Sequence, residues 1–183
     1  ACLMQGARAA SDKHTFFRHR DTADARRKLA KIRAKDTENA ILVVTEGLFS
    51  MDSDSPDILS LQEVCREFDA VLLVDVAHDL GASGPRGTGQ IGLQGALGQV
   101  DLVMGAFSKT LASNGGYLAT NHASVKHYVS IYGGSHAFSN ALSPIQAGVV
   151  LESLRIVPSE EGERLRAKAS ANIKRVGPAF EGE

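Results

Sequence analysis

Residues 71–75 read VLLVD, a run of four aliphatic residues that ends in a carboxylate. A continuous aliphatic run of this length is typical of a strand that is covered on both faces of a parallel sheet. A second run of this kind, ILVVT, occupies residues 41–45. Between the two runs, Pro56 is followed by apolar residues at helical spacing as far as Phe68. This strand–helix–strand order predicts a parallel pair of strands joined by a helix.

The same alternation continues on both sides of this unit. We expect a helix that begins at Asp21 or Thr22 and runs to about Ala34, because either residue can cap it. Three shorter strands are predicted at His14–Phe17, Leu102–Met104 and Gly116–Thr120, and two more helices at Ser124–Tyr132 and from Pro144 to a break at Pro158. The sequence therefore predicts an α/β fold, a three-layer α/β/α arrangement around a mostly parallel sheet.

Composition restricts the class of protein. The 183 residues carry 20 Lys and Arg against 21 Asp and Glu, so the net charge of −1 gives no reason to expect nucleic acid or an anionic membrane as partner. No stretch reaches the roughly 18 apolar residues that span a bilayer. Cys2 and Cys65 are too few for a disulfide framework, which favours a reducing compartment and hence a cytoplasmic location.

Polar side chains follow the ends of three predicted strands. Glu46 and Ser50 come after the first of these strands, and Lys109 comes after the third. Asp75 closes the strand between them, and His78 follows it in the next turn. Each residue has a simpler explanation, since Asp75 could cap a turn and Lys109 could be a surface lysine. Because the carboxyl ends of parallel strands meet at one edge, however, all five side chains could face a single crevice.

Lys109 has no charged neighbour in the sequence, since small and apolar residues flank it. Burial would lower the pKa of such a lysine and favour the free amine that forms a Schiff base. The other histidines have no mutual metal-ligand spacing, so we expect no metal site. Residues 84–89 resemble a phosphate-binding loop only superficially, because the Gly-Lys-Ser/Thr ending is missing.

Several segments, taken together and in order, resemble the α-oxoamine synthases, which are fold-type I enzymes dependent on pyridoxal phosphate (PLP). The matching segments are FRHRD at 17–21, EGLFSMD at 46–52, LVDVAHDLG at 73–81, GAFSK at 105–109, GGY at 115–117 and FSNALSP at 138–144. The run at 98–109, together with residues 120–122, resembles bacterial serine palmitoyltransferases most closely, whereas FSNAL leans towards glycine C-acetyltransferases.

The resemblance implies a role for each candidate residue. Lys109 would carry the internal aldimine, and Asp75 would pair with the protonated pyridine nitrogen, which keeps the ring an electron sink. His78 and Ser50 would contact the phenolic oxygen of the cofactor, and His78 is expected to be catalytic together with Lys109. The remaining residues that we expect at the cofactor are Glu46, Ser108 and Asn140, the last of which would reach the active site of a neighbouring subunit.

The resemblance also implies the reaction and the organisation of the whole protein. Members condense a small amino acid, here serine or glycine, with an acyl-CoA, and release CO2, CoA and an α-amino ketone. We expect a homodimer with its active site at the subunit interface, and membrane association only for a protein like serine palmitoyltransferase. Residues 1–157 would belong to the PLP-binding large domain, and residues 158–183 would form a helical linker towards a C-terminal small domain. The chain would thus be a central fragment, inactive on its own.

Three positions depart from the family pattern. Val76 replaces a residue that is usually acidic, Asp79 replaces a usual Ser or Gly, and Ala106 replaces a hydroxyl residue that helps to hold the cofactor phosphate. Two alternatives therefore stay open. One is a fold-type I aminotransferase or lyase, since Asp75 and Lys109 would serve those reactions equally well. The other is a catalytically silent partner subunit, which Lys109 argues against because such a subunit needs no aldimine lysine.

Overall fold

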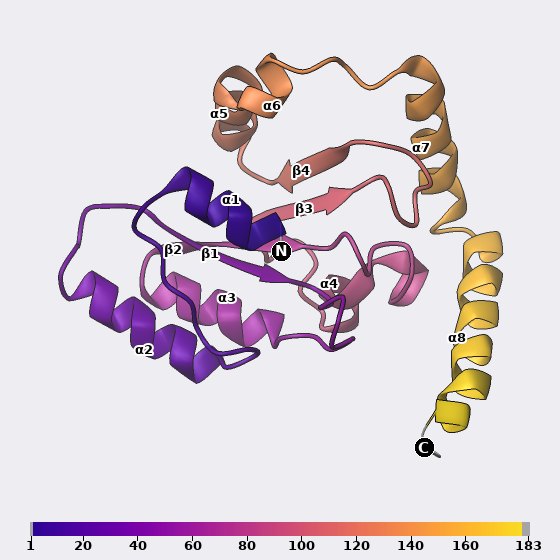
Figure 1. Ribbon diagram of the computed structural model, residues 1–183, viewed down its shortest axis with the longest axis horizontal. Helices are drawn as coiled ribbons and strands as arrows, with labels where there is room; N and C mark the ends of the chain where they lie inside the picture. The colour runs from indigo at the N-terminus through magenta and orange to yellow at the C-terminus, as the bar shows by residue number, and fades with distance from the viewer. Residues whose placement is uncertain (1, 181–183) are drawn as a thin grey trace.

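A four-stranded sheet forms the centre of the molecule in the computed structural model, which describes residues 2–180 and the side chains of residues 2–176 (Figure 1). Three neighbouring strands are parallel, and the fourth runs antiparallel to the third. In spatial order they are β1 (Ile41–Glu46), β2 (Ala70–Asp75), β3 (Leu102–Ala106) and β4 (Gly116–Thr120). The predicted α/β fold with a mostly parallel sheet is confirmed.

Helices precede and connect these strands. They are α1 (Cys2–Ala10), α2 (Thr22–Arg33), α3 (Ile58–Glu67), the 3-10 turn η1 (Pro85–Gly87), α4 (Gly89–Leu93), α5 (Ala123–Tyr132), α6 (Gly134–Ala137), α7 (Pro144–Ile156) and α8 (Glu160–Phe180). Side chains cap three of the predicted helices: Asp21 accepts the N–H of Asp24, Asp57 accepts that of Ser60, and Ser143 accepts that of Gln146.

The strand predicted at His14–Phe17 is wrong. This segment has no strand pairing, and the Phe16 ring is 47% exposed while only Phe17 packs against the core. Two adjacent aromatic residues place one ring on each side of an extended chain, so the pair does not bury both. The break predicted at Pro158 is confirmed, since α7 ends at Ile156 and α8 begins at Glu160.

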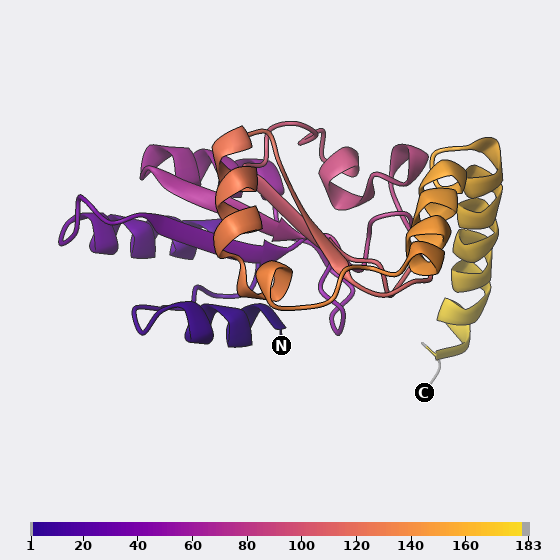
Figure 2. The ribbon, with the colours of Figure 1, turned by 90° about the horizontal axis from the view of Figure 1, so that it is seen from above.

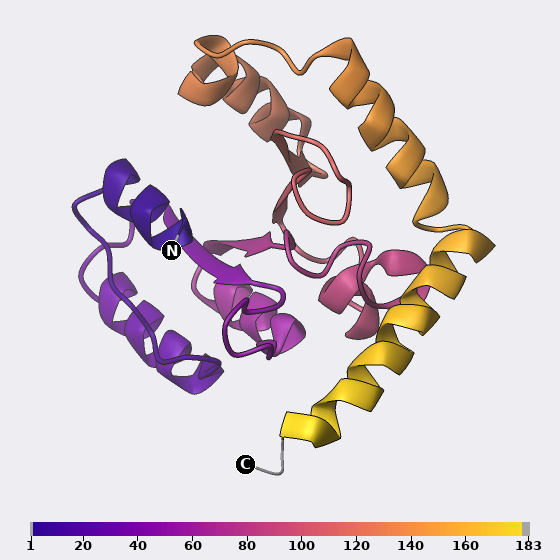
Figure 3. The same cartoon turned by 45° about the vertical axis from the view of Figure 1, so that its right-hand side comes forward.

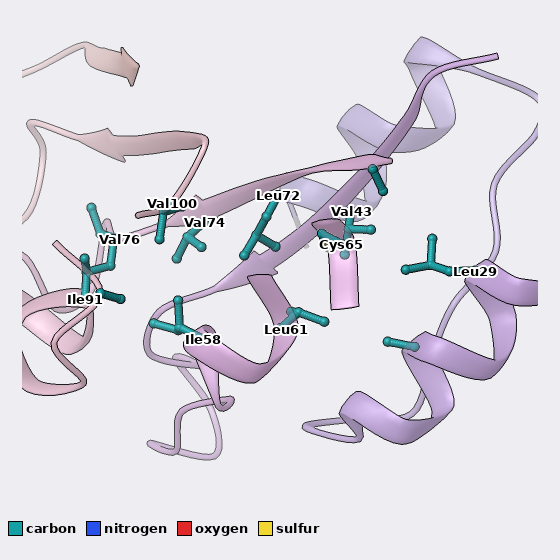
Figure 4. Packing of buried hydrophobic residues seen from close by; sticks show 13 residues of the cluster. Leu29, Val43, Ile58, Leu61, Cys65, Leu72, Val74, Val76, Ile91 and Val100 are labelled. Atoms are coloured by element: carbon teal, nitrogen blue, oxygen red, sulfur yellow. The ribbon is translucent and has the colours of Figure 1, made fainter. Parts of the chain in front are cut away.

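The core lies between the sheet and helices α2 and α3 (Figure 4). Alternate residues of β1 and β2 face these helices, so Val43, Leu72 and Val74 are buried, whereas Leu42 and Val71 on the opposite face are exposed. Burying one such aliphatic side chain contributes about 1.5–3 kcal/mol. The main buried partners from the helices are Leu29, Ile58, Leu61 and Cys65.

Helices α7 and α8 form the end of the molecule that lies farthest from α2 (Figures 2 and 3). Arg166 of α8 donates from Nη1 to the Val157 carbonyl at 2.7 Å, and its Nη2 pairs with Glu163 at 2.8 Å. Among the described helices, none is long and apolar enough to cross a membrane. The first residue of the segment expected at 1–157 and the last three residues of the segment expected at 158–183 lie outside the described residues.

Candidate active site at the carboxyl edge of the sheet

The carboxyl ends of β1, β2 and β3 lie side by side at one edge of the sheet. Glu46 is the register partner of Asp75, which in turn pairs with Met104 of β3. Two backbone hydrogen bonds join the strands just beyond these residues, from Gly47 N to the Asp75 carbonyl and from Val76 N to the Met104 carbonyl, both 2.8 Å long. The expected convergence of the three strand ends is therefore confirmed.

Asp75 is half-buried and lies on the sheet face opposite the core. Its Oδ1 accepts the N–H of Ala77 at 2.9 Å, which is the turn-capping contact that the simpler interpretation predicts. Its Oδ2 has no hydrogen-bond partner among residues 2–176. One oxygen thus fixes the carboxylate while the other remains available to a cationic donor.

His78 and Asp79 follow in the turn that leaves β2. Hydrogen bonds to the Val76 carbonyl from Leu80 N (3.0 Å) and Asp79 N (3.3 Å) hold this turn. His78 is exposed, whereas Asp79 is completely buried. Consecutive residues of one turn thus face solvent and core, so the imidazole is free to meet a ligand while the carboxyl behind it is not.

Lys109 lies on the loop that joins β3 to β4. The loop is closed by hydrogen bonds from Phe107 N to the Gly115 carbonyl (3.0 Å) and from Ser113 N to the Phe107 carbonyl (2.8 Å). Lys109 is exposed. The described residues of this chain therefore do not bury the lysine that the sequence predicted to be buried. No hydrogen bond or ion pair engages its amine within the described part of the chain.

The Lys109 loop touches the Asp75 turn. A Cβ on Gly81 would lie 2.5 Å from Cγ2 of Thr110, so the glycine is what allows the two segments to approach. Gly81 also has φ of +82°, a conformation that favours glycine. The structure therefore brings the segments that carry Asp75, His78 and Lys109 into contact.

Ser50 lies exposed on the loop that leaves β1. The loop is closed by the hydrogen bond from Phe49 N to the Asp54 carbonyl at 2.9 Å. His19 packs its ring against Phe49, with centroids 4.4 Å apart, and its Nε2 lies 3.0 Å from both carboxylate oxygens of Asp54. Arg20 donates to the same carboxylate at 3.0 Å. Segments 17–21 and 46–52, two of the matching stretches, thus support one another.

Burial opposes ionisation of Asp54, but its bonds to His19 and Arg20 outweigh this effect and lower the pKa of the carboxyl. The loop that presents Ser50 is therefore held by a charged carboxylate at neutral pH.

The remaining two candidates lie in different places. Ser108 is exposed beside Lys109 and so shares its loop. Asn140 is exposed in the connection from α6 to α7, which runs along the top of the view in Figure 1. Leu142 of this connection comes near Gly115. Among the described residues, no hydrogen bond joins Asn140 to Asp75 or to Lys109. Its expected role at a neighbouring subunit stays a prediction.

Sequence reasoning missed two residues beneath this edge. Asp79 entered only as a departure from the family pattern, and Tyr117 was read as part of a strand. Burial raises the pKa of Tyr117 to about 12. A carboxyl four residues after Asp75 and two residues before a glycine is the signal that could have pointed to Asp79.

The donor set of this edge fits pyridoxal phosphate in part. Asp75 offers a free carboxylate oxygen for a protonated ring nitrogen, and Lys109 offers an unpaired amine for an aldehyde. His78, Ser50 and Ser108 add exposed groups that hydrogen-bond. Ala106 brings no hydroxyl for a phosphate, which leaves that end of the ligand to other groups.

Another hollow, of about 560 Å³, lies at the opposite edge of the sheet, among the residues that begin the strands, including Ile41, Ala70 and Leu102. Ligands of open α/β sheets bind outside the carboxyl ends of the strands, so we assign no chemistry to it. Among the described residues, no group of three His, Cys, Asp or Glu side chains could hold a metal ion.

Comparison with known proteins shows the family to which the chain belongs. A family model described as aminotransferase class I and II matches residues 6–181. The chain is 38% identical over 160 residues to a serine palmitoyltransferase of Sphingobacterium spiritivorum, covering 87% of this chain and 39% of the relative. It is 39% identical over 180 residues to a putative 8-amino-7-oxononanoate synthase of Bordetella pertussis, covering 93% and 44%. The chain thus spans about two fifths of the length of these relatives.

Solved structures of serine palmitoyltransferases have a similar fold. A structure described as SPT with PLP internal aldimine superposes with a TM-score of 0.78 at 30% identity, covering 88% of this chain and 41% of that one. A serine palmitoyltransferase of Sphingomonas wittichii gives a TM-score of 0.79 at 29% identity, covering 87% and 39%. The expected cofactor agrees with the first description. The chain belongs to the aminotransferase class I and II family.

Proposed function

We propose that this chain supplies the cofactor-holding part of a PLP-dependent α-oxoamine synthase, which condenses serine or glycine with an acyl-CoA and releases CO2 and CoA. The observation that carries the proposal is the single edge at which β1, β2 and β3 end, because it gathers a carboxylate, an imidazole and an amine. The names of the relatives support the reaction class. Since those relatives are more than twice as long, the activity proposed is that of the whole protein.

Each side chain receives a role from its position. Asp75 Oδ2 would accept the N–H of a protonated pyridine ring, while Oδ1 keeps its bond to Ala77 N. Lys109 would hold the cofactor aldehyde through Nζ, and its amine would also serve as the base that moves a proton at the Cα of the amino acid. His78 and Ser50 would hydrogen-bond the phenolic oxygen of the cofactor, with Glu46 and Ser108 beside them.

When bound, the cofactor supplies the electron sink that stabilises a carbanion at the amino-acid Cα. The chain's part is to hold this ring in register with the acyl donor. Asp75 fixes one end of it through charge, which is effective because the carboxylate is half-buried and one oxygen is already held.

We further propose that the protein acts as a homodimer in the cytoplasm, with Asn140 reaching the partner's active site. Large apolar side chains are exposed on α5, on α7 and on the connection between α6 and α7, a pattern typical of an interface. They include Tyr128, Ile131, Tyr132, Phe138 and Ile145. Residues 1–157 are proposed as part of the large domain and residues 158–183 as the linker to a small domain. We propose membrane association only if the protein acts as a serine palmitoyltransferase.

The description of the matched family favours aminotransfer as a second candidate, because Asp75 and Lys109 would serve that reaction as well. Incubating the whole protein with PLP, serine or glycine, and acyl-CoAs of several lengths distinguishes the two. We expect CoA release that depends on both substrates. Formation of a 2-oxo acid from the amino acid without CoA release would instead assign the aminotransferase, and neither product would favour a silent partner subunit.

Residues 1–183 expressed alone are expected to be inactive, to bind PLP weakly and to aggregate, because exposed apolar patches of more than a few hundred Å² promote aggregation. The check is a PLP titration together with a measurement of mass in solution. A soluble monomer that binds cofactor stoichiometrically and releases CoA would contradict this expectation.

A further inference from the structure

Asp79 is the most enclosed carboxyl group at the carboxyl edge of the sheet. Its side chain is 0% exposed, Oδ2 accepts the N–H of Gln90 at 2.6 Å, and Oδ1 has no hydrogen-bond partner in the described structure. An ionised carboxylate in such a place lacks compensation for its lost hydration, which costs several kcal/mol. A neutral carboxylic acid avoids most of this cost.

Two glycines enclose the carboxyl group. A Cβ on Gly47 would lie 2.9 Å from Asp79 Oδ2, and one on Gly89 would lie 2.4 Å from the same atom. Gly47 directly follows β1 and donates its N–H to the Asp75 carbonyl, while Gly89 begins α4. Asp79 therefore packs where the end of β1, the β2 turn and the start of α4 meet.

The groups that face Asp79 offer no strong cationic partner. Asp75, in the same turn, disfavours a second negative charge, and the exposed His78 is a weaker opposing influence. From β4 comes Tyr117, whose buried hydroxyl also lacks a hydrogen-bond partner among the described atoms. From β1 and α4 come Gly47 and the backbone N–H of Gln90.

Two further charged groups lie on neighbouring elements without compensating Asp79. Glu46 lies on the opposite face of β1. Arg166 of α8 reaches the Gly81 turn but pairs with Glu163 and the Val157 carbonyl. Burial raises the pKa of Asp79 above its usual value, against the hydrogen bond from Gln90 that lowers it.

We propose that Asp79 is a positioning residue that remains protonated in the folded protein and locks the β2 turn, which carries Asp75 and His78, against β1 and α4. In the neutral form it fixes the turn without adding a second charge beside Asp75. Asp75 is then the dominant negative charge of this turn that faces the ring nitrogen. The link to the cofactor rests on the proposed function, whereas the protonation of Asp79 does not.

The pH dependence follows from the sign of the shift. A carboxyl with a raised pKa in the folded state contributes its full stability below its usual value of 3.8, and this contribution is lost as pH rises towards the folded value. Asp79→Asn keeps the shape and the acceptor for Gln90 but cannot ionise. Relative to this variant, the wild-type protein should therefore lose stability as the pH rises.

The test uses the whole protein without cofactor and measures its unfolding temperature from about pH 5 to about pH 8. We expect the wild type to fall relative to Asp79→Asn by about 2 °C or more over this range. Asp12→Asn, a change at an exposed aspartate, is the matched control and should run parallel to the wild type. Parallel curves for wild type and Asp79→Asn would overturn the proposal.

A second readout addresses the positioning of Asp75. PLP binding to Asp79→Asn, followed by absorbance, should match the wild type from about pH 5 to about pH 8, because Asp79 is already neutral in the folded wild type. A wild-type affinity that falls below that of the variant as the pH rises would show that Asp79 ionises and would overturn the proposal. Asp79→Ala, which removes the Gln90 acceptor, should bind PLP about tenfold more weakly, the effect of losing one hydrogen bond to a charged or buried group. Equal affinity in Asp79→Ala would show that the turn does not need this contact.

These outcomes remain distinct from failure of the proposed function. If the protein binds PLP but releases no CoA, the proposed reaction fails while both Asp79 readouts stand. If Asp79→Asn does not fold, Asp79→Ser takes its place, since a smaller neutral side chain fits the same space. The infrared band of a protonated carboxylic acid in the wild type at neutral pH, absent from Asp79→Ser, would then support the proposal, and its absence from the wild type would overturn it.

Discussion

The two segments that meet at the carboxyl edge of the sheet are built differently. The segment from Asp75 to Gly89 is fastened from inside, with Asp79 and Gly81 buried and backbone hydrogen bonds reaching β1 and β3. The Lys109 loop from Phe107 to Gly115 is held mainly at Leu111, which is 2% exposed, whereas Ser108, Lys109, Thr110 and Asn114 are exposed.

This difference matches what each segment has to do. A carboxylate that stabilises a ring charge works best when it is fixed, because reorienting it during the reaction costs free energy. An amine that binds an aldehyde and then moves a proton needs freedom to swing. We therefore expect changes in the first segment to alter stability and charge, and changes in the Lys109 loop to alter chemistry with less effect on folding.

The largest expected effect is that of Lys109→Ala. Turnover of the whole protein should fall by at least about 10³-fold because the nucleophile and base are lost together, while the unfolding temperature changes little at this exposed position. Borohydride reduction of the wild type with PLP should label Lys109. Lys126→Ala, at another exposed lysine, is the control. Labelling of a different lysine would remove Lys109 from the site.

Asp75→Asn tests the fixed segment. The amide keeps an oxygen that accepts the Ala77 N–H but loses the negative charge. We expect PLP still to bind and kcat to fall by about 10²–10³-fold, with a smaller change in KM, since the lost interaction strengthens in the transition state. Steady-state kinetics with serine or glycine check this. Turnover close to that of the wild type would reduce Asp75 to a turn cap.

Two glycine substitutions compare the packing of the two segments. In Gly81→Ala the new Cβ overlaps Thr110 and φ is +82°, so we expect a loss of about 3 kcal/mol. In Gly115→Ala φ is +95° but the nearest atoms lie 3.5 Å away, so only the strain of about 1–2 kcal/mol remains. Adding Thr110→Ser to Gly81→Ala should recover about 1 kcal/mol, because Cγ2 is removed. Denaturant unfolding measures all three, and equal losses at both glycines would contradict the comparison.

Ser113→Ala should have the smallest effect. Its Oγ donates to the Gln146 carbonyl at 3.1 Å and so ties the Lys109 loop to α7. Removing this bond should cost about 0.5–1.5 kcal/mol. Ser108→Ala, in the same loop but without a hydrogen bond among the described atoms, should not alter stability. Hydrogen exchange of the loop amides would show whether Ser113 restrains them.

The sheet could be predicted from the sequence because its strands are aliphatic runs between clear helix starts. The runs VLLVD and ILVVT form β2 and β1. Asp21, Asp57 and Ser143 cap the predicted helices α2, α3 and α7. Residues 14–17 misled because a local apolar pair resembles a strand, whereas strand formation needs a neighbour to pair with. α1, α4 and α6 escaped prediction. α4 and α6 have only five and four residues, too few to show a helical period, and no residue of α1 is buried.

The sequence could predict which residues of the candidate site lie near one another, but not which of their side chains are buried and which are exposed. Parallel strands in sequential order place Glu46, Asp75 and Lys109 at one edge, which follows from topology. Whether Lys109 is exposed or Asp79 buried depends on contacts between segments far apart in the chain, such as Thr110 against Gly81. The spacing of apolar residues in the sequence carries no information about such contacts. The exposure of Lys109 and the burial of Asp79 therefore became known only from the structure.

The enclosure of Asp79 restricts how this sequence can change over generations. A Cβ at position 47 would lie 2.9 Å from Oδ2 and 3.1 Å from Oδ1 of Asp79. A larger residue at position 47 is therefore tolerated only after Asp79 has been replaced by a residue with a shorter side chain. The two positions are therefore expected to mutate in a fixed order, with 79 first. In a library randomised at both sites, Ala or Ser at 47 should survive almost entirely in clones that carry Ser or Gly at 79.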